Sequence, residues 1–247
     1  METISAKKTE MREREQRMLE LARRMVLEGG YHGLGLDSLA RELGVSRGTI
    51  YNHFKCKEEI ILALLVETMD RRREMFQRAA SYAGNPRVRL AAVGVAAELF
   101  VRLYPEHFRF EQIVKSDSIW DKTTQERRSL VKSCQMQCVA IVAGIVRDAL
   151  AQSHLQLPEG MTPESLVFGL WSMTEGAYSI VATSDAVREL GIHSPFQAVR
   201  THIHRTLDGF HWTPLASDVD YNQVMQQALL DVFPQEAAKL KEAWSPA

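Results

Sequence analysis

Cysteine is scarce in this chain, and the scarcity limits the kinds of protein it can encode. Its 247 residues include three cysteines, Cys56, Cys134 and Cys138. They are too few and too irregularly spaced for a disulfide framework, which fits a reducing compartment. No spacing of cysteine and histidine typical of a structural zinc site is present.

The chain also lacks a targeting segment that its sequence would reveal. The first residues, METISAKKTEMRERE, contain no apolar run long enough for a signal peptide, and charges interrupt the later apolar stretches within about 20 residues. We therefore expect a cytoplasmic protein with no membrane partner.

Motifs for catalysis are missing as well. The sequence has no nucleophile elbow, no phosphate-binding glycine loop and no HExxH pair. Scattered serine, histidine and aspartate do not make a catalytic triad without spatial proof. We expect no enzymatic activity, no cofactor and no metal.

An excess of one charge is absent too, since the formal net charge is −1. Residues 1–78 contain 15 lysines and arginines against 13 aspartates and glutamates, and the remainder contains 15 against 18. This tilt permits DNA binding by a local surface and argues against sequence-blind coating of nucleic acid.

Apolar residues recur at helical spacing through most of the chain, with 45% hydrophobic residues overall. Val-rich and Ile-rich pieces such as VAIVAGIV lie inside longer helical patterns without flanking turn residues, which favours helix over strand. We predict an all-α fold without internal repeats. The expected helices cover residues 10–28, 36–43, 57–80, 87–104, 106–115, 122–154, 163–183, 195–209 and 218–233.

The stretch LARELGVSRGTIYNHF interrupts a helical pattern with a glycine. Gly44 allows a positive φ that turns the chain sharply, and Ser46 can cap the next helix. Ala40 is small enough for two helices to cross closely, and Ile50 is large enough to fill the crossing. These offsets predict a helix-turn-helix.

The second helix of this motif places Ile50 and Phe54 inward, four residues apart. The other positions then face wholly or partly outward, with side chains that can donate to phosphates and base edges. Lys55 and Lys57 follow at the start of the next helix, where a phosphate would be favourable. The predicted DNA-binding residues are Ser46, Arg47, Thr49, Tyr51, Asn52, His53, Lys55 and Lys57.

An ordinary helical corner with solvent-facing polar residues is the alternative, and the sequence YNHFKCKEE argues against it. The segments LA, GVS, YNHF and KEE, over about residues 10–80, resemble the TetR family of bacterial transcriptional regulators. The resemblance implies an all-helical homodimer with N-terminal DNA-binding heads and a divergent C-terminal domain for ligand binding and dimerisation. It also implies DNA contacts at the predicted positions, Lys55 excepted.

Two positions depart from the family pattern. Gly35 and Leu36 stand where the family usually has Thr or Ser contacting phosphate, so we do not expect that contact. Cys56 replaces the usual Ser and would be a weaker helix cap. With this resemblance we divide the chain into a flexible arm (1–9), a helix-turn-helix domain (10–56), a connecting helix (57–80) and a ligand-binding and dimerisation domain (81–247).

The C-terminal region offers weaker signals for a ligand pocket. Trp171, Glu175 and Tyr178 share one helix face, and the isolated Glu175 needs a partner, which is either a ligand or a side chain. Ordinary core packing explains the apolar residues of this helix as well as a dimer face or a pocket wall does. The candidate pocket residues are Tyr104, Phe108, Trp120, Met136, Trp171, Glu175 and Tyr178.

Two further clusters have a functional and a plain interpretation. Cys134 and Cys138 lie four residues apart on one helix face, as a redox pair would, although free cysteines on apolar helices are usually core. His202 and His204 point in different directions on a helix, which disfavours a shared metal.

The preferred interpretation is a ligand-responsive repressor. As a dimer it would bind double-stranded operator DNA in two major grooves about 34 Å apart, and a hydrophobic or amphipathic small-molecule effector would release it. An activator of the same family and a helical ligand-binding protein or enzyme without DNA affinity stay open at this point.

Overall fold

The computed structural model describes residues 2–115 and 117–243, and in them it contains thirteen helices and no strand. The all-α prediction is confirmed. By packing, the chain forms an N-terminal unit, Met1–Met69 with Arg109–Ser133, and a C-terminal unit, Asp70–Phe108 with Cys134–Ala247. Three helices, α4 (Lys57–Ala80), α6 (Glu106–Val114) and α8 (Gln125–Ala151), contribute residues to both units.

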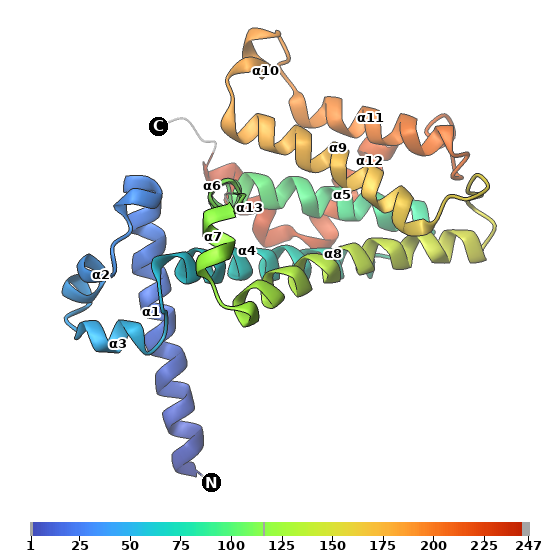
Figure 1. The fold of residues 1–247 in the computed structure, drawn as a ribbon. Helices are drawn as coiled ribbons and strands as arrows, with labels where there is room; N and C mark the ends of the chain where they lie inside the picture. The colour runs from blue at the N-terminus through green and yellow to red at the C-terminus, as the bar shows by residue number, and fades with distance from the viewer. Residues whose placement is uncertain (1, 116, 244–247) are drawn as a thin grey trace. The chain divides into compact units, whose positions relative to one another are not determined.

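The N-terminal unit begins with α1 (Glu2–Gly33), so residues 2–9 continue the first helix in place of the expected flexible arm. Gly30 has φ 64° and breaks the helical geometry near the end of α1, where the Gly-Gly pair predicts a stop. The motif helices α2 (Leu36–Leu43) and α3 (Arg47–Tyr51) follow, and the first turns of α4 complete the head (Figure 1).

The second segment of the N-terminal unit comprises most of α6 (Glu106–Val114), all of α7 (Asp117–Lys122) and the start of α8. Several contacts attach it to the head. Arg109 donates to the Leu27 carbonyl at 2.9 Å, and the guanidinium of Arg127 lies 5.2 Å from the Phe54 ring centre and 3.2 Å from Glu15. The sequence gives no hint that these distant residues pack with the head.

The C-terminal unit packs the end of α4 with α5 (Pro86–Leu103), the second part of α8, α9 (Pro163–Thr183) and α11 (Pro195–Gly209), which run roughly alongside one another (Figure 1). The short α10 (Ala186–Glu189) connects α9 to α11. Alanines and valines of α5 are buried, and Phe100 and Trp212 are among the largest fully buried side chains. One apolar core therefore joins these helices.

The last two helices, α12 (Tyr221–Val232) and α13 (Pro234–Ala243), pack on α5. Asp220 caps α12 by accepting from the N–H groups of Asn222 and Gln223, so this helix begins at residue 221 and not at 218. Pro234 begins α13, because proline is well tolerated in the first helical turn. We did not expect this helix. Helices α7 and α10 were also missed.

Within the described residues, α8 is long and apolar enough to cross a membrane by length and composition. Its residues Val142, Ala143, Val146 and Ala149 are buried in the core of the C-terminal unit. In this fold α8 is a core helix and not a membrane span.

A candidate DNA-reading surface and ligand pocket

The turn between α2 and α3 has the geometry that its sequence predicts. Gly44 has φ 66°, in the left-handed region, and its N–H faces the carbonyls of Ala40 and Arg41 at the end of α2. Ser46 caps α3 by accepting from the N–H of Thr49 at 3.1 Å. Ala40 and Ile50 are buried, so the crossing of the two helices is closely packed.

One face of α3 and the loop after it presents polar side chains to solvent. The exposed members of the predicted set are Ser46, Arg47, Tyr51, Asn52 and Lys55. Tyr51 is 52% exposed, so its ring and hydroxyl are accessible to a partner. Arg47 pairs with Asp37 of α2, and this exposed ion pair is easily exchanged for a phosphate.

The other three predicted residues are less accessible. Thr49 is half-buried, and its hydroxyl lies 2.9 Å from that of Ser46. The side chain of His53 is 4% exposed, and its Nδ1 lies 3.6 Å from Glu15. Lys57 donates to the Tyr31 carbonyl at 3.3 Å, and its Nζ lies 3.9 Å from the Tyr31 ring centre. His53 and Lys57 are thus positioned to support α3 and α4.

The first turn of α4 is anchored by two buried glutamates, Glu58 and Glu59. Glu58 accepts from the Tyr31 hydroxyl at 2.6 Å and from Lys122 Nζ at 3.2 Å. Burial alone would raise the pKa of Glu58, but hydrogen bonds from Tyr31, from its own backbone and from Lys122 outweigh it and lower the pKa to about 2. Glu59 accepts from the N–H groups of Lys55 and Thr124.

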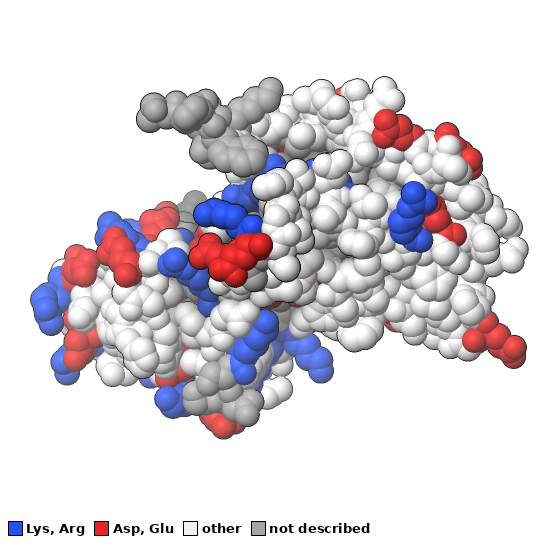
Figure 2. Space-filling model, turned by 90° about the horizontal axis from the view of Figure 1, so that it is seen from above, with Lys and Arg blue, Asp and Glu red and all other residues white. Residues whose placement is uncertain are grey.

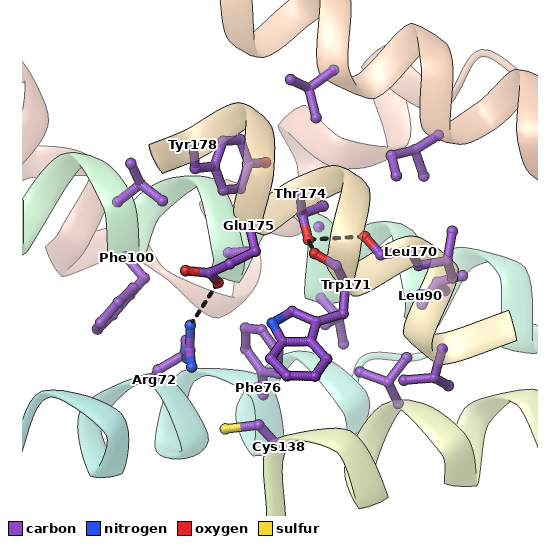
Figure 3. Close-up of a pocket in the computed structure, with 18 of the residues that line it drawn as sticks. Arg72, Phe76, Leu90, Phe100, Cys138, Leu170, Trp171, Thr174, Glu175 and Tyr178 are labelled. Carbon is purple, nitrogen blue, oxygen red and sulfur yellow. Dashed lines mark hydrogen bonds and ion pairs between the residues drawn. The ribbon is translucent and has the colours of Figure 1, made fainter. Parts of the chain in front are cut away.

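The C-terminal unit contains a cavity of about 140 Å³ (Figure 3). Its wall is mainly apolar and comes from α4, α5, α6, α8, α9, α11 and α12. Four of the predicted pocket residues line it: Phe108, Trp171, Glu175 and Tyr178. The spacing of the last three on one helix face places them together, as the sequence predicted.

Three predicted pocket residues do not line this cavity. Met136 is 52% exposed, because the α8 face that enters the core carries Gln135, Cys138 and Val139 instead. Tyr104 lies at the end of α5, where its ring packs 5.5 Å from Phe100, and Trp120 lies on α7 in the N-terminal unit. Aromatic character alone did not reveal which face of a helix points inward.

Arg72 is the pocket residue that our sequence reasoning missed. It is 9% exposed, lines the cavity from α4 and faces Glu175 on α9, with Nη1 3.3 Å from Oε2 (Figure 3). The spacing of residues along α4 could have placed Arg72 on the inward face. This face carries residues three or four positions apart: Leu65, Met69, Arg72 and Phe76. The run of three arginines concealed it.

Of the cysteine pair, Cys138 lines the pocket, and Cys134 Sγ lies 3.8 Å from Asp70. Burial raises the pKa of both thiols, which disfavours the reactive thiolate. Among the described residues no group of three or more His, Cys, Asp and Glu side chains could hold a metal ion.

Comparisons with known proteins agree with this geometry. Residues 18–64 match the family described as "Bacterial regulatory proteins, tetR family", a segment that spans the end of α1, α2, α3 and the start of α4. The "Fatty acid metabolism regulator protein" of Bacillus subtilis (strain 168) is 25% identical over 190 residues, covering 72% of this chain and 94% of the relative. The "HTH-type transcriptional regulator UidR" of Escherichia coli (strain K12) is 23% identical, covering 77% and 93%.

The fold is similar to that of solved regulators as well. A putative transcriptional regulator from Saccharomonospora viridis, solved in complex with choline, has 20% identity and a TM-score of 0.61, covering 79% of this chain and 96% of that one. The family is not enzymatic. With its helix-turn-helix, its all-helical fold and these relatives, this chain belongs to the TetR family of DNA-binding transcriptional regulators.

Proposed function

We propose that this regulator is a cytoplasmic repressor that binds a pseudo-palindromic operator as a homodimer and is released by a small effector with an apolar body. The observation that carries the proposal is the position of Arg72. This side chain lines the cavity from α4, and α4 is the continuous helix whose first turn, with Glu58 and Glu59, anchors the head.

The exposed residues of α3 and the following loop support specific DNA reading. Arg47 and Lys55 are suited to phosphates, and Asn52 and Tyr51 can reach base edges in the major groove. In Figure 2, charged side chains of both signs gather over the N-terminal unit, while that face of the C-terminal unit shows few. A mixed charge favours a local contact over sequence-blind attraction to DNA.

Homodimerisation is supported by the outward face of α9. Phe168 and Ile180 are 64% and 52% exposed, and the exposed small residues Gly169, Ser172 and Gly176 lie between them. Small residues let a partner helix approach closely, and large exposed apolar residues favour burial in an interface. We propose that α9 packs against the same helix of a second copy.

Effector control follows from two-site binding. Two heads must fit two grooves at once, so a small change in their spacing weakens both contacts together. An effector shifts this equilibrium by its differential affinity for the two shapes, about 1–3 kcal/mol, or roughly 5–150-fold in operator affinity. The apolar wall of the cavity fits an acyl or aromatic body, and the B. subtilis relative is by name a regulator of fatty acid metabolism.

Fluorescence anisotropy with labelled DNA from upstream of the gene tests this function. We expect that scrambled duplex displaces the labelled DNA poorly, and that the affinity falls steeply as the salt concentration rises. Asn52→Ala should reduce the preference for the specific duplex, and Gln223→Ala, on an exposed position of α12, serves as a matched control without effect. A folded protein that ignores every duplex at low ionic strength would contradict the proposal.

A promoter–reporter assay tests the sign of regulation, since an activator would need the same DNA contacts. Deleting the gene should raise transcription from the bound promoter. A fall in transcription would show activation and overturn the repressor assignment while leaving DNA binding intact.

A further inference from the structure

The cavity of the C-terminal unit contains few charged groups, and their balance favours one kind of ligand. Of its lining residues, Arg72, Arg200 and Glu175 carry formal charges. His204 also lines it, but burial, followed by the nearby charge of Arg87, lowers its pKa to about 4, so the imidazole is neutral near pH 7. The lining therefore contains two arginines and one carboxylate, and Arg200 has a further carboxylate partner, Glu98, outside the lining.

The two arginines are engaged very differently. Arg200 makes two hydrogen bonds to Glu98, from Nε at 2.9 Å and from Nη2 at 3.1 Å. Arg72 makes one hydrogen bond to Glu175, at 3.3 Å from Nη1, and its guanidinium also lies 5.6 Å from the Phe100 ring centre and beside the Cys138 thiol. Within the described part of the chain, the buried Nε of Arg72 has no hydrogen-bond partner. A guanidinium has five N–H donors, so Arg72 retains capacity for an acceptor that enters the cavity.

We propose that the cavity binds a small organic acid whose carboxylate displaces Glu175 as the ion-pair partner of Arg72. A carboxylate offers two acceptors that match the donor fork of a guanidinium, and such charge-assisted bonds are stronger than neutral ones. This inference rests on the proposed function, in which the cavity is the effector site, and it names the chemistry of the effector.

The size of the cavity limits the body of the acid. Its volume of about 140 Å³ is close to the roughly 150 Å³ of an apolar cavity that binds benzene. Around Arg72 and Glu175, Phe76, Phe100 and Trp171 supply apolar and aromatic surface (Figure 3). The fitting ligand has one ring, or an aliphatic chain of about six carbons.

Exposure indicates which partner of the ion pair gives way. The Glu175 side chain is 25% exposed and that of Arg72 is 11% exposed. Glu175 can therefore turn toward water at a lower desolvation cost, whereas Arg72 stays buried and keeps its need for an anion. A cationic ligand would have to displace the more buried group, Arg72.

The exchange acts on the helix that begins in the head. Arg72 links α4 to α9 through Glu175. A bound carboxylate replaces that link by one to the ligand, so α4 is released from α9 at this point. Since α4 is continuous from Lys57 to Ala80, the change affects the helix whose first turn holds Glu58 and Glu59.

Isothermal titration calorimetry on the full chain without DNA tests the ligand assignment. The probes are hexanoate and benzoate, their uncharged counterparts hexan-1-ol and benzyl alcohol, and the cation hexyltrimethylammonium. We expect each carboxylate to bind about tenfold more tightly than its alcohol, the gain of one charge-assisted contact. Carboxylates that bind no better than the alcohols, or a preference for the ammonium, would overturn the assignment.

Variants at the ion pair sharpen the test. Arg72→Gln should abolish the advantage of the carboxylates, and Glu175→Gln should strengthen their binding severalfold by removing the competitor. Arg73→Gln is the matched control, because Arg73 is the next residue of α4, pairs with Asp70 and does not line the cavity. The double variant Arg72→Gln with Glu175→Gln keeps the charge balance and should likewise lose the carboxylate preference.

Circular dichroism establishes that each variant is folded before titration. A folded Arg72→Gln or double variant with unchanged carboxylate affinity, or a Glu175→Gln variant with weaker affinity, refutes the inference. These titrations contain no DNA, so their failure differs from a failure of the proposed function. The latter would appear as absent operator binding with carboxylate binding intact.

Discussion

The DNA-reading surface of the N-terminal unit and the cavity of the C-terminal unit use their polar residues in opposite ways. The N-terminal unit exposes Arg47, Asn52 and Lys55 on a short helix and loop whose inner face is closed by Ile50 and Phe54. The C-terminal unit contains two buried arginines, Arg72 in the cavity wall and Arg87 inside the core. Polar groups that meet DNA must be accessible, whereas buried polar groups must find a partner in the protein or in a ligand.

Arg87 provides the strongest test of this contrast. It is 1% exposed, and it donates to Asp208 at 2.7 Å and to the carbonyls of His204 and Trp212. Removing the partner of a buried charge destabilises a protein by about 3–5 kcal/mol, so Asp208→Ala should lower the unfolding free energy by that amount. Chemical denaturation measures the change. Wild-type stability in Asp208→Ala would show that Arg87 does not depend on its ion pair.

Ile50 tests the inner face of the reading helix. It is fully buried between α2 and α3, and replacement of a buried isoleucine by alanine costs about 2–5 kcal/mol. Ile50→Ala should abolish operator binding and leave ligand binding by the C-terminal unit unchanged. Anisotropy and calorimetry on the same sample check both results. Loss of both activities together would show that the two units do not fold separately.

Two substitutions on the exposed face of α3 and the loop after it should have different effects on DNA binding. Asn52→Ala should remove about 1–3 kcal/mol of discrimination between operator and scrambled DNA. Lys55→Ala should weaken binding to both duplexes equally and reduce the magnitude of the salt slope by about 1. Lys57→Ala should have a weaker effect than Lys55→Ala, because Lys57 is held against Tyr31. Titrations at several salt concentrations separate these outcomes, and reversed roles for Asn52 and Lys55 would contradict the assigned contacts.

The smallest expected effect concerns the cap of α3. Ser46 accepts from the N–H of Thr49, and loss of such a cap costs about 1 kcal/mol. Ser46→Ala should lower the thermal midpoint slightly, and Ser46→Asp should restore it while weakening DNA binding through its negative charge. A Ser46→Asp variant with normal operator affinity would show that this helix end does not approach phosphate.

The same contrast explains how far the sequence could predict the structure. Local rules were sufficient for the head: Gly44 needs a left-handed φ, Ser46 caps the next helix, and Ile50 follows Ala40 at the spacing of a close crossing. The bounds of α2 and α4 were predicted correctly for that reason. The long apolar helices α5 and α9 were also found, since their periodicity is strong.

Features that depend on tertiary packing were harder to predict from the sequence. Met136 and Tyr104 lie on predicted helices, but the face of each helix that enters the cavity is set by its neighbours. His53 faces Glu15 from a position that the motif alone would place outward. Arg72 was overlooked among three arginines, although its spacing with Met69 and Phe76 indicates the inward face. The packing of residues 109–133 with the head has no local signature.

The central claim is that two copies of this chain bind one DNA duplex, each through its α3. Analytical ultracentrifugation of a fluorescent upstream duplex with increasing protein, at low and moderate salt, tests it directly. The account predicts a complex of two protomers per duplex that forms with wild type and is lost with Ile50→Ala. A complex with a single protomer, or free duplex at every protein concentration, would contradict it.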